Sequence, residues 1–148
     1  MEELGHLIKL RHEKLQDLRG KGIAPYINRF KVDTAIQSLV DDFALESKEE
    51  LEEKDHTCIA AGRIMTRRKH GKTTFVNIQD STGQIQVFIN KNALGEEAYE
   101  LFGKFDIGDI IGVEGRVSKT KTGELTLFST KTTLLSKSLL PLPEKWHG

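Results

Sequence analysis

The stretch from Arg67 to Gln86 joins a basic end, an aromatic ring and a side-chain amide across two short strand-like segments. Along 73–79, Thr, Val and Ile occupy every second position, and Phe75 belongs to the alternate set. Successive side chains of a strand point to opposite faces, so the aliphatic set faces a core and Phe75 stays on a polar, solvated face beside Gln86. A ring on such a face is suited to stacking on an unpaired nucleic-acid base.

Three further side chains extend this recognition chemistry on the same predicted face. The Gln86 amide carries donor and acceptor groups that complement a base edge, for instance the O4 acceptor and N3–H donor of uracil. Arg68 can donate to base oxygens or phosphates, and the Glu124 carboxylate can accept from an N3–H. Each could also be a surface side chain without a partner, but the common face of all four predicts a binding site.

Catalytic and metal-binding patterns are absent from the sequence. The histidines are scattered, none stands at metal-ligand spacing from a cysteine or another histidine, and the glycines of 108–115 do not form a nucleotide-binding loop. Cys58 lies in an apolar segment and is expected to be a buried packing residue. Asp80 and Asp109 are expected to be turn residues. We therefore expect no catalytic residue, metal or cofactor in this chain.

Composition predicts a soluble globular protein of one domain plus a small appendage. The chain has 148 residues, of which 37% are hydrophobic and 30% charged, and no apolar run is long enough to span a membrane. A single cysteine excludes an internal disulfide and, with no signal-peptide pattern at the N-terminus, favours a cytoplasmic location. The net charge of zero argues against indiscriminate coating of nucleic acid.

Charge is nevertheless unevenly distributed along the chain. Residues 41–55 contain eight acidic residues and two lysines, whereas residues 63–72 contain five basic residues, His70 and no acid. The acidic run fits a solvated helix surface, and the basic run fits either a solvated hairpin tip or a nucleic-acid contact.

Three helical segments and an extended one are expected before the strands. The apolar pattern predicts a helix over 2–20, followed by extended chain over 23–32. Asp33 or Thr34 can cap a short helix that runs through Phe43. Ser47 with Glu50 forms a capping box for another helix over 48–54.

From residue 57 onward the pattern changes to short strands with one interposed helix. Leu94, Ala98, Leu101, Phe102 and Phe105 give this helix a single apolar stripe. Glycines within the strands (Gly62, Gly112, Gly115) predict bulges or bends. The expected strands are 57–69, 72–80, 84–90, 109–120 and 124–136, with the helix at 92–105.

This element order predicts the fold class: mainly β with α, a five-stranded OB-fold barrel with an N-terminal helical extension. The barrel of an OB-fold binds oligonucleotides on the face of its second and third strands. The expected division is an N-terminal helical extension over 1–55 packed on the barrel, the OB-fold over 56–138, and a proline-containing linker over 139–148.

At these residues the chain resembles a known family, the N-terminal anticodon-binding domain of class II lysyl-tRNA synthetases. The R-R-x-x-G-K-x-x-F…Q-D-x-x-G-x-I-Q spacing of 67–86 is shared with the aspartyl and asparaginyl relatives, whereas K-T-K-T-G-E-L and the final segment look specifically lysyl. The matching stretches are LRHEKLQDLRGKGIAPY (10–26), AGRIMTRRKHGKTTFVNIQDSTGQIQVF (61–88), FDIGDIIGVEGRVSKTKTGELTL (105–127) and LLSKSLLPLPEKWHG (134–148).

The resemblance implies a specific partner and specific roles. Phe75 would stack on an anticodon uridine of lysine tRNA, Gln86 and Arg68 would read the uridines of a UUU-type anticodon, and Glu124 would assist. Family members continue beyond the W-H-G segment into a catalytic domain that uses ATP and Mg²⁺. This chain is therefore expected to bind tRNA without ligase activity of its own, and to be a monomer although the parent enzyme is a homodimer.

Two other functions remain open at the level of the sequence. A general single-strand-binding OB module would use the same face without preferring uracil, although the zero net charge and few exposed aromatics count against it. A protein-interaction domain would instead use the acidic 41–55 segment or the N-terminal helix.

Overall fold

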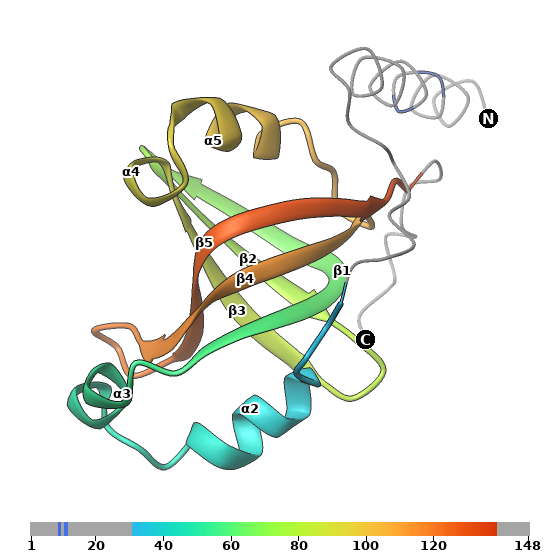
Figure 1. Ribbon diagram of the computed structural model, residues 1–148. Helices are drawn as coiled ribbons and strands as arrows, with labels where there is room; N and C mark the ends of the chain where they lie inside the picture. The colour runs from blue at the N-terminus through green and yellow to red at the C-terminus, as the bar shows by residue number, and fades with distance from the viewer. Residues whose placement is uncertain (1–8, 10, 12–30, 139–148) are drawn as a thin grey trace.

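A closed barrel of five strands forms the body of the molecule (Figure 1). The computed structural model describes Lys9, Arg11 and residues 31–138, so the predicted helix over 2–20, most of the segment 23–32 and the tail 139–148 lie outside the described residues. The strands are β1 (Thr57–His70), β2 (Thr73–Gln79), β3 (Gln84–Asn90), β4 (Ile110–Lys119) and β5 (Leu125–Ser136).

The barrel order is β1-β2-β3-β5-β4, with β4 pairing back to β1. All neighbours are antiparallel except β3 and β5, which run parallel. This topology confirms the predicted OB-fold, mainly β with α. Each predicted strand agrees with the observed bounds to within one residue.

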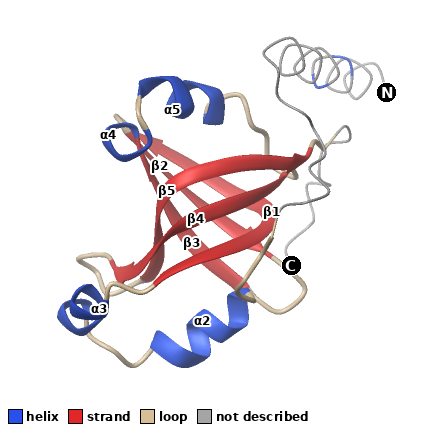
Figure 2. Ribbon diagram, in the orientation of Figure 1, coloured by secondary structure: helices blue, strands red, loops and turns tan. Residues whose placement is uncertain are grey.

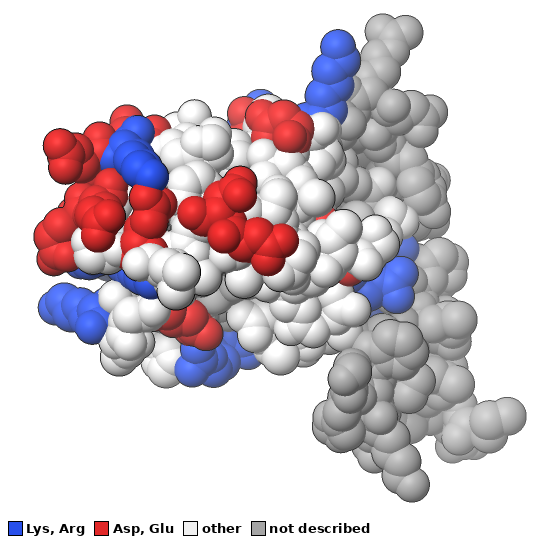
Figure 3. All heavy atoms as spheres, turned by 90° about the horizontal axis from the view of Figure 1, so that it is seen from below, with Lys and Arg blue, Asp and Glu red and all other residues white. Residues whose placement is uncertain are grey.

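Two pairs of helices lie at opposite ends of the barrel (Figure 2). Helices α2 (Ile36–Phe43) and α3 (Lys48–Lys54) are at one end, and α4 (Lys91–Leu94) and α5 (Glu96–Phe102) at the other. Viewed from the end that carries α2 and α3, acidic side chains outnumber basic ones (Figure 3). The acidic run over 41–55 is thus collected at the end away from α4 and α5.

The alternation predicted for 73–79 is confirmed in β2, and in β2 and β3 alike one set of side chains fills the barrel. Val76, Ile78, Val87 and Ile89 are at most 1% exposed, whereas Phe75 on the alternate set is half-buried. Burying an aliphatic side chain of this size contributes about 1.5–3 kcal/mol to folding. The barrel core therefore fixes which residues of these strands remain available on the outer face.

The single helix predicted over 92–105 is wrong, because Gly95 interrupts it. The φ of Gly95 is 92°, a conformation outside the helical region, and α4 ends where α5 begins. The interruption rotates the second segment, so Tyr99 is buried and Ala98 is exposed. Phe102 and Phe105 reach the core as expected.

The cap of α2 also differs from the prediction. Ala35 occupies the N-cap position without a side-chain bond, and Asp33 instead accepts a hydrogen bond from the Ile59 N–H at 2.8 Å. The free N–H groups of the first turn are met by the β2–β3 turn: Ile36 donates to Asp80 Oδ2 and Gln37 to Thr82 Oγ1, both at 3.0 Å. The capping box of Ser47 and Glu50 on α3 is confirmed.

Asp109 is not a simple turn residue, as the sequence had suggested, because it is fully buried. Lys137 Nζ donates to Asp109 Oδ2 at 2.8 Å and also to the Asp106 carboxylate. The Lys137 side chain is 1% exposed. This ion cluster joins the end of β5 to the segment that leads into β4.

Candidate nucleic-acid interface

One line of side chains crosses all five strands in register on the outer face of the barrel. Arg68 of β1 pairs with Phe75 of β2, Phe75 with Phe88 of β3, Phe88 with Phe128 of β5, and Phe128 with Arg116 of β4. Cross-strand neighbours share a face of the sheet. We call the three phenylalanines Phe75, Phe88 and Phe128 the ring row.

The ring row is continuous and ends in a guanidinium group on each side. The ring centroids of Phe75 and Phe88 are 5.4 Å apart, and those of Phe88 and Phe128 are 5.0 Å apart. Arg68 Cζ lies 5.7 Å from the Phe75 centroid, and Arg116 Cζ lies 5.4 Å from the Phe128 centroid. Contacts of this length are cation–π interactions, so positive charge lies beside a broad apolar surface.

A groove of about 500 Å³ opens over the ring row, and we call it the aromatic groove. Arg68 and His70 at the end of β1 form one side of it. The β4–β5 turn forms another, through Lys119, Lys121 and Glu124. Rings on the floor and cations on the walls suit a ligand with flat apolar bases and a negative backbone.

Gln86 lies in the aromatic groove, but not on a solvated surface as predicted. It is only 5% exposed. Its Nε2 donates to Thr126 Oγ1 at 3.0 Å, and its Oε1 accepts from Arg68 at 3.4 Å. A side-chain amide has two N–H donors and two acceptor lone pairs, so one of each remains unused. The amide is therefore held in a fixed orientation with hydrogen-bonding capacity to spare.

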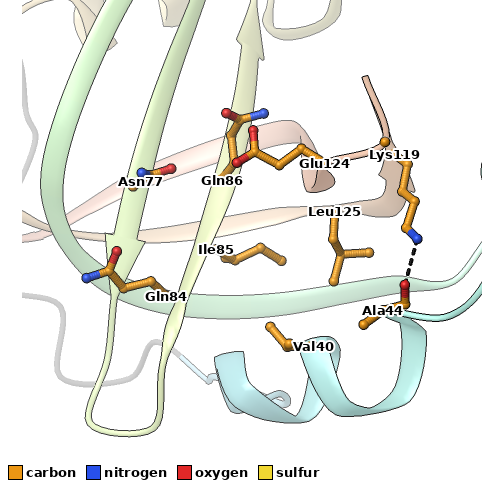
Figure 4. A pocket seen from close by; sticks show the side chains of 10 residues that line it. Val40, Ala44, Asn77, Gln84, Ile85, Gln86, Lys119, Glu124 and Leu125 are labelled. Atoms are coloured by element: carbon orange, nitrogen blue, oxygen red, sulfur yellow. Dashed lines mark hydrogen bonds between the residues drawn. The ribbon is translucent and has the colours of Figure 1, made fainter. Parts of the chain in front are cut away.

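Glu124 is exposed and lines the aromatic groove together with Gln86. Both also line an adjoining cavity of about 360 Å³ between the barrel and α2. In Figure 4 the side chains of Gln86 on β3 and of Glu124 in the β4–β5 turn project into this same space. Lys119 Nζ donates to the Ala44 carbonyl at 2.7 Å, which ties the β4–β5 turn to the end of α2.

The fold thus brings together all four residues that the sequence singled out: Arg68, Phe75, Gln86 and Glu124. Their roles in binding stay a prediction. Sequence reasoning missed Phe128 and Arg116, which join the line only through the parallel β3–β5 pair and the β4–β5 register. Phe88 lies on the same face, and nothing local in the sequence marked it as a neighbour of two other rings.

Alternative chemistries find little support in the described part of the chain. Within residues 31–138, no group of three His, Cys, Asp or Glu side chains could hold a metal ion. Burial raises the pKa of the Cys58 thiol to about 11, so the thiolate that a nucleophile requires is scarce at neutral pH. None of the described helices combines the length and apolar character that crossing a membrane would require.

Barrel topology and the aromatic groove together define an OB-fold nucleic-acid-binding domain. Comparison with protein families gives the same class: residues 59–135 match the tRNA anticodon family, described as an OB-fold nucleic acid binding domain, and the chain belongs to this family.

The similar curated proteins belong to one kind of enzyme within this class. The chain is 50% identical over 147 residues to the lysine–tRNA ligases of Pelotomaculum thermopropionicum, Bacillus thuringiensis and Bacillus anthracis. The alignments cover 99% of this chain but only 28% of the first relative and 30% of the other two. The chain therefore spans less than a third of the length of these relatives.

Proposed function

We propose that this domain binds the anticodon loop of a lysine tRNA and prefers a UUU-type anticodon. The observation that carries the proposal is the position of Phe75 and Gln86, an open ring and an oriented amide on one face of an anticodon-family OB-fold. The similarity to lysine–tRNA ligases over nearly the whole chain supports lysine tRNA as the partner.

Phe75 supplies the stacking surface for one anticodon base. It stands at the end of the ring row, half-buried, with Arg68 on one side and Phe88 on the other. Stacking of a base on an aromatic side chain is worth about 1–3 kcal/mol and is the same for every base type to a first approximation. Phe75 thus contributes affinity, and base identity must be read by a polar neighbour.

Gln86 is the polar neighbour that reads the base. Its free N–H can donate to O4 of uracil, while Oε1 accepts the N3–H. Cytosine presents a donor at N4 and an acceptor at N3, so both contacts would be mismatched. Because the bond to Thr126 already fixes the amide, the mismatch cannot be relieved by a free rotation of the side chain.

Arg68 and Glu124 assist from the two walls of the aromatic groove. Arg68 lies against both Phe75 and Gln86, so it can donate to a base oxygen or to the neighbouring phosphate. Glu124 offers a carboxylate to the N–H edge of an adjacent base. Neither role requires a proton transfer or a covalent step.

The proposed contribution is selection of the tRNA, with the ligase chemistry performed elsewhere in a longer enzyme. The relatives are lysine–tRNA ligases of which this chain matches less than a third. In such an enzyme, ATP and Mg²⁺ would be used by the catalytic part. We expect the 148-residue chain alone to bind tRNA and to form no lysyl-tRNA.

The test is binding of this chain to an anticodon stem–loop with a UUU loop and to one with a changed middle base, at one fixed low salt concentration. We expect the UUU loop to bind at least about tenfold more tightly, which corresponds to roughly 1.4 kcal/mol. Equal binding of the two loops would contradict the proposed base reading.

A sequence-tolerant single-strand binder is the second candidate, and the ring row favours it. Three adjacent rings can stack successive bases whatever their identity. Under this alternative, a polyuridine and a polycytidine strand of equal length would bind with similar affinity. Under the proposed function, the polyuridine strand binds more tightly and replacement of Gln86 removes the difference.

A further inference from the structure

A second groove lies on the other side of the β1–β2 hairpin, and none of the four predicted site residues lines it. It has a volume of about 430 Å³ and is bounded by the hairpin, α4 and α5. We call it the basic groove, because its lining includes five cationic side chains and one carboxylate, Glu100. The cations are Arg67, Lys69, Lys72, Lys91 and Lys104.

Strand alternation explains why one hairpin serves two grooves. Arg68 and His70 line the aromatic groove. Arg67, which precedes Arg68, and Lys69, which lies between Arg68 and His70, line the basic groove. Residues one apart in a strand point to opposite faces. The last residues of β1 therefore form a wall with positive charge on both sides.

One main-chain and one side-chain hydrogen bond join the β1–β2 hairpin to the start of α4 beside the basic groove. The Lys91 N–H donates to the Lys72 carbonyl at 2.9 Å, and Asn90 Nδ2 donates to Thr73 Oγ1 at 2.9 Å. These bonds fix the tip of the hairpin to the start of α4. Lys72 and Lys91 thus line the same groove, and a cluster of positive charges there attracts an anion.

Two of these lysines, Lys69 and Lys72, carry positive charge that no carboxylate of the described residues pairs. Across 31–138, neither Lys69 nor Lys72 has a carboxylate partner, and Lys91 Nζ stands 3.8 Å from the Glu96 carboxylate. Arg67 instead donates to the carbonyls of Gly103 and Phe105, so its charge is fixed at the end of α5. The basic groove therefore combines one cation in a fixed position, Arg67, with two lysines, Lys69 and Lys72, that have no carboxylate partner among the described residues.

We propose that the basic groove binds phosphates of the RNA strand whose bases occupy the aromatic groove, where the strand passes over the β1–β2 hairpin. The inference rests on the proposed function and adds to it a backbone-binding site. An RNA strand fits better than an acidic peptide because the hairpin is a wall of both grooves, so one continuous polyanion can reach both. Phosphate contacts position the ligand and carry no base preference.

The test compares the salt dependence of stem–loop binding for the full chain and three double variants. Lys72→Gln with Lys91→Gln removes two charges from the basic groove, one from the hairpin and one from α4. Lys72→Arg with Lys91→Arg keeps both charges. Lys31→Gln with Lys131→Gln is the matched control, because these lysines line neither groove. Affinity for the UUU loop and for the changed loop is measured across a range of salt concentrations.

We expect the Lys72/Lys91 glutamine variant to lower the steepness of log affinity against log salt by about 1.4. This value corresponds to the loss of two phosphate contacts with a single strand, at about 0.7 for each contact. Its affinity should fall roughly tenfold or more at about 0.1 M salt, with the ratio between the two loops unchanged. The arginine variant should keep the original slope. If the glutamine pair does not fold, Lys72→Gln alone should lower the slope by about 0.7.

The outcomes separate this inference from the proposed function. Equal binding of both loops, with the slope still reduced by the glutamine variant, would refute base reading and support the phosphate site. If the glutamine variant keeps the slope and affinity of the control pair, the phosphate site is overturned, and an acidic peptide becomes the alternative occupant. The ratio of affinities for the two loops still tests base reading in that case. Absence of any RNA binding at low salt would overturn both.

Discussion

The hydroxyl group of Thr126 connects two of the predicted site residues. Thr126 Oγ1 accepts from Gln86 Nε2 at 3.0 Å and donates to the Glu124 carbonyl, also at 3.0 Å. The residue is fully buried beneath the aromatic groove. It touches no ligand in the proposed function, yet it determines how the Gln86 amide is oriented.

Thr126→Val should therefore weaken base discrimination although it leaves the ring row intact. The change removes the acceptor for Gln86 Nε2, and a buried polar group left unpaired costs about 1–3 kcal/mol. Gln86 can then rotate, so we expect the ratio between UUU and changed loops to fall severalfold.

The matched control is Ser129→Ala on the same strand. Ser129 is 2% exposed and donates to the Lys131 carbonyl at 3.2 Å, away from Gln86. It should lower the melting temperature without altering the loop ratio. An unchanged loop ratio in Thr126→Val would show that Gln86 needs no such support.

Phe75→Ala should retain the fold and lose RNA affinity. Phe75 is on the outer face, so its removal spares the barrel core but takes away about 1–3 kcal/mol of stacking. This corresponds to roughly 5- to 150-fold weaker binding of the stem–loop. Phe75→Leu keeps an apolar contact with Phe88 and lacks the π-face, so its affinity should also fall. A large drop in melting temperature for both variants would assign Phe75 to the core instead.

At the residue scale, the sequence was informative where a property is local. Alternation along β2 is sufficient to assign Phe75 and Val76 to opposite faces, because neighbouring side chains of a strand point in opposite directions. The burial of Gln86 was not predictable, because it depends on Thr126 of β5. Strand β5 is far from β3 in the sequence and becomes its neighbour only through their parallel pairing.

Helix α2 depends on a cap that comes from another element. Asp80 Oδ2 accepts from the Ile36 N–H, while Oδ1 accepts from the N–H groups of Thr82 and Gly83. Burial by itself raises the pKa of Asp80, but these hydrogen bonds outweigh it and the net pKa is lowered. The charged carboxylate is therefore the form that the fold prefers.

Asp80→Asn should destabilise the protein at neutral pH by about 0.5–2 kcal/mol, the usual worth of such a cap. Because the folded-state pKa is lowered, the wild-type advantage is present above the unfolded value of about 3.9 and is lost as the pH falls through the folded-state pKa. Denaturant unfolding of both proteins at several pH values measures this. The exposed Asp42→Asn is the control, and an equal cost for the two variants would contradict the cap.

Strand β4 carries a glycine that the packing of β5 requires. A Cβ added to Gly115 would lie 2.3 Å from the Phe128 carbonyl oxygen, next to the register shift between Glu114 and Gly115. Gly115→Ala should cost about 1–3 kcal/mol or more, as overpacking does. It should also displace Phe128 and weaken RNA binding. Gly71→Ala, with φ +60° and no atom within 4 Å of the added Cβ, is the control and should cost about 1–2 kcal/mol from backbone strain alone.

At the element scale, periodicity predicted which segments form strands. It did not predict the hydrogen bonds that join one element to another. The capping box of α3 is contained within four consecutive residues and was predicted correctly. The cap of α2 joins Ile36 to Asp80, 44 residues apart, so no local pattern reveals it. In the sequence, Gly95 could stand inside a continuous helix, because a single glycine is tolerated there. Only its φ of 92° shows that the helix is divided at this residue.

Across the whole molecule, charge is separated along the barrel. The acidic run of α2 and α3 is at one end (Figure 3), whereas the cations of the basic groove surround α4 and the β1–β2 hairpin at the other. A net charge of zero therefore conceals local patches of opposite sign on the described part of the chain. The cationic patch favours RNA that approaches over the hairpin.

The ion cluster of Lys137, Asp106 and Asp109 joins the chain just after β5 to the segment before β4. Main-chain bonds of 2.8 Å link Ile64 N–H to the Asp109 carbonyl and Gly108 N–H to the Ile64 carbonyl, while Lys137 binds the Asp109 side chain from β5. Residues of β1, β5 and the segment before β4 thus meet at one buried point. A charge pair in such a place is costly to break, because the remaining partner keeps its charge without water.

Lys137→Met should therefore destabilise the protein by about 3–5 kcal/mol, more than any other change argued above. The double variant Lys137→Met with Asp109→Asn removes the orphaned charge and should recover part of this loss, measured by denaturant unfolding. Lys131→Met is the control, because that lysine is exposed and lies 3.9 Å from Glu114 at the surface. Similar stability of Lys137→Met and Lys131→Met would mean that the barrel closes without the ion cluster, by aliphatic packing alone.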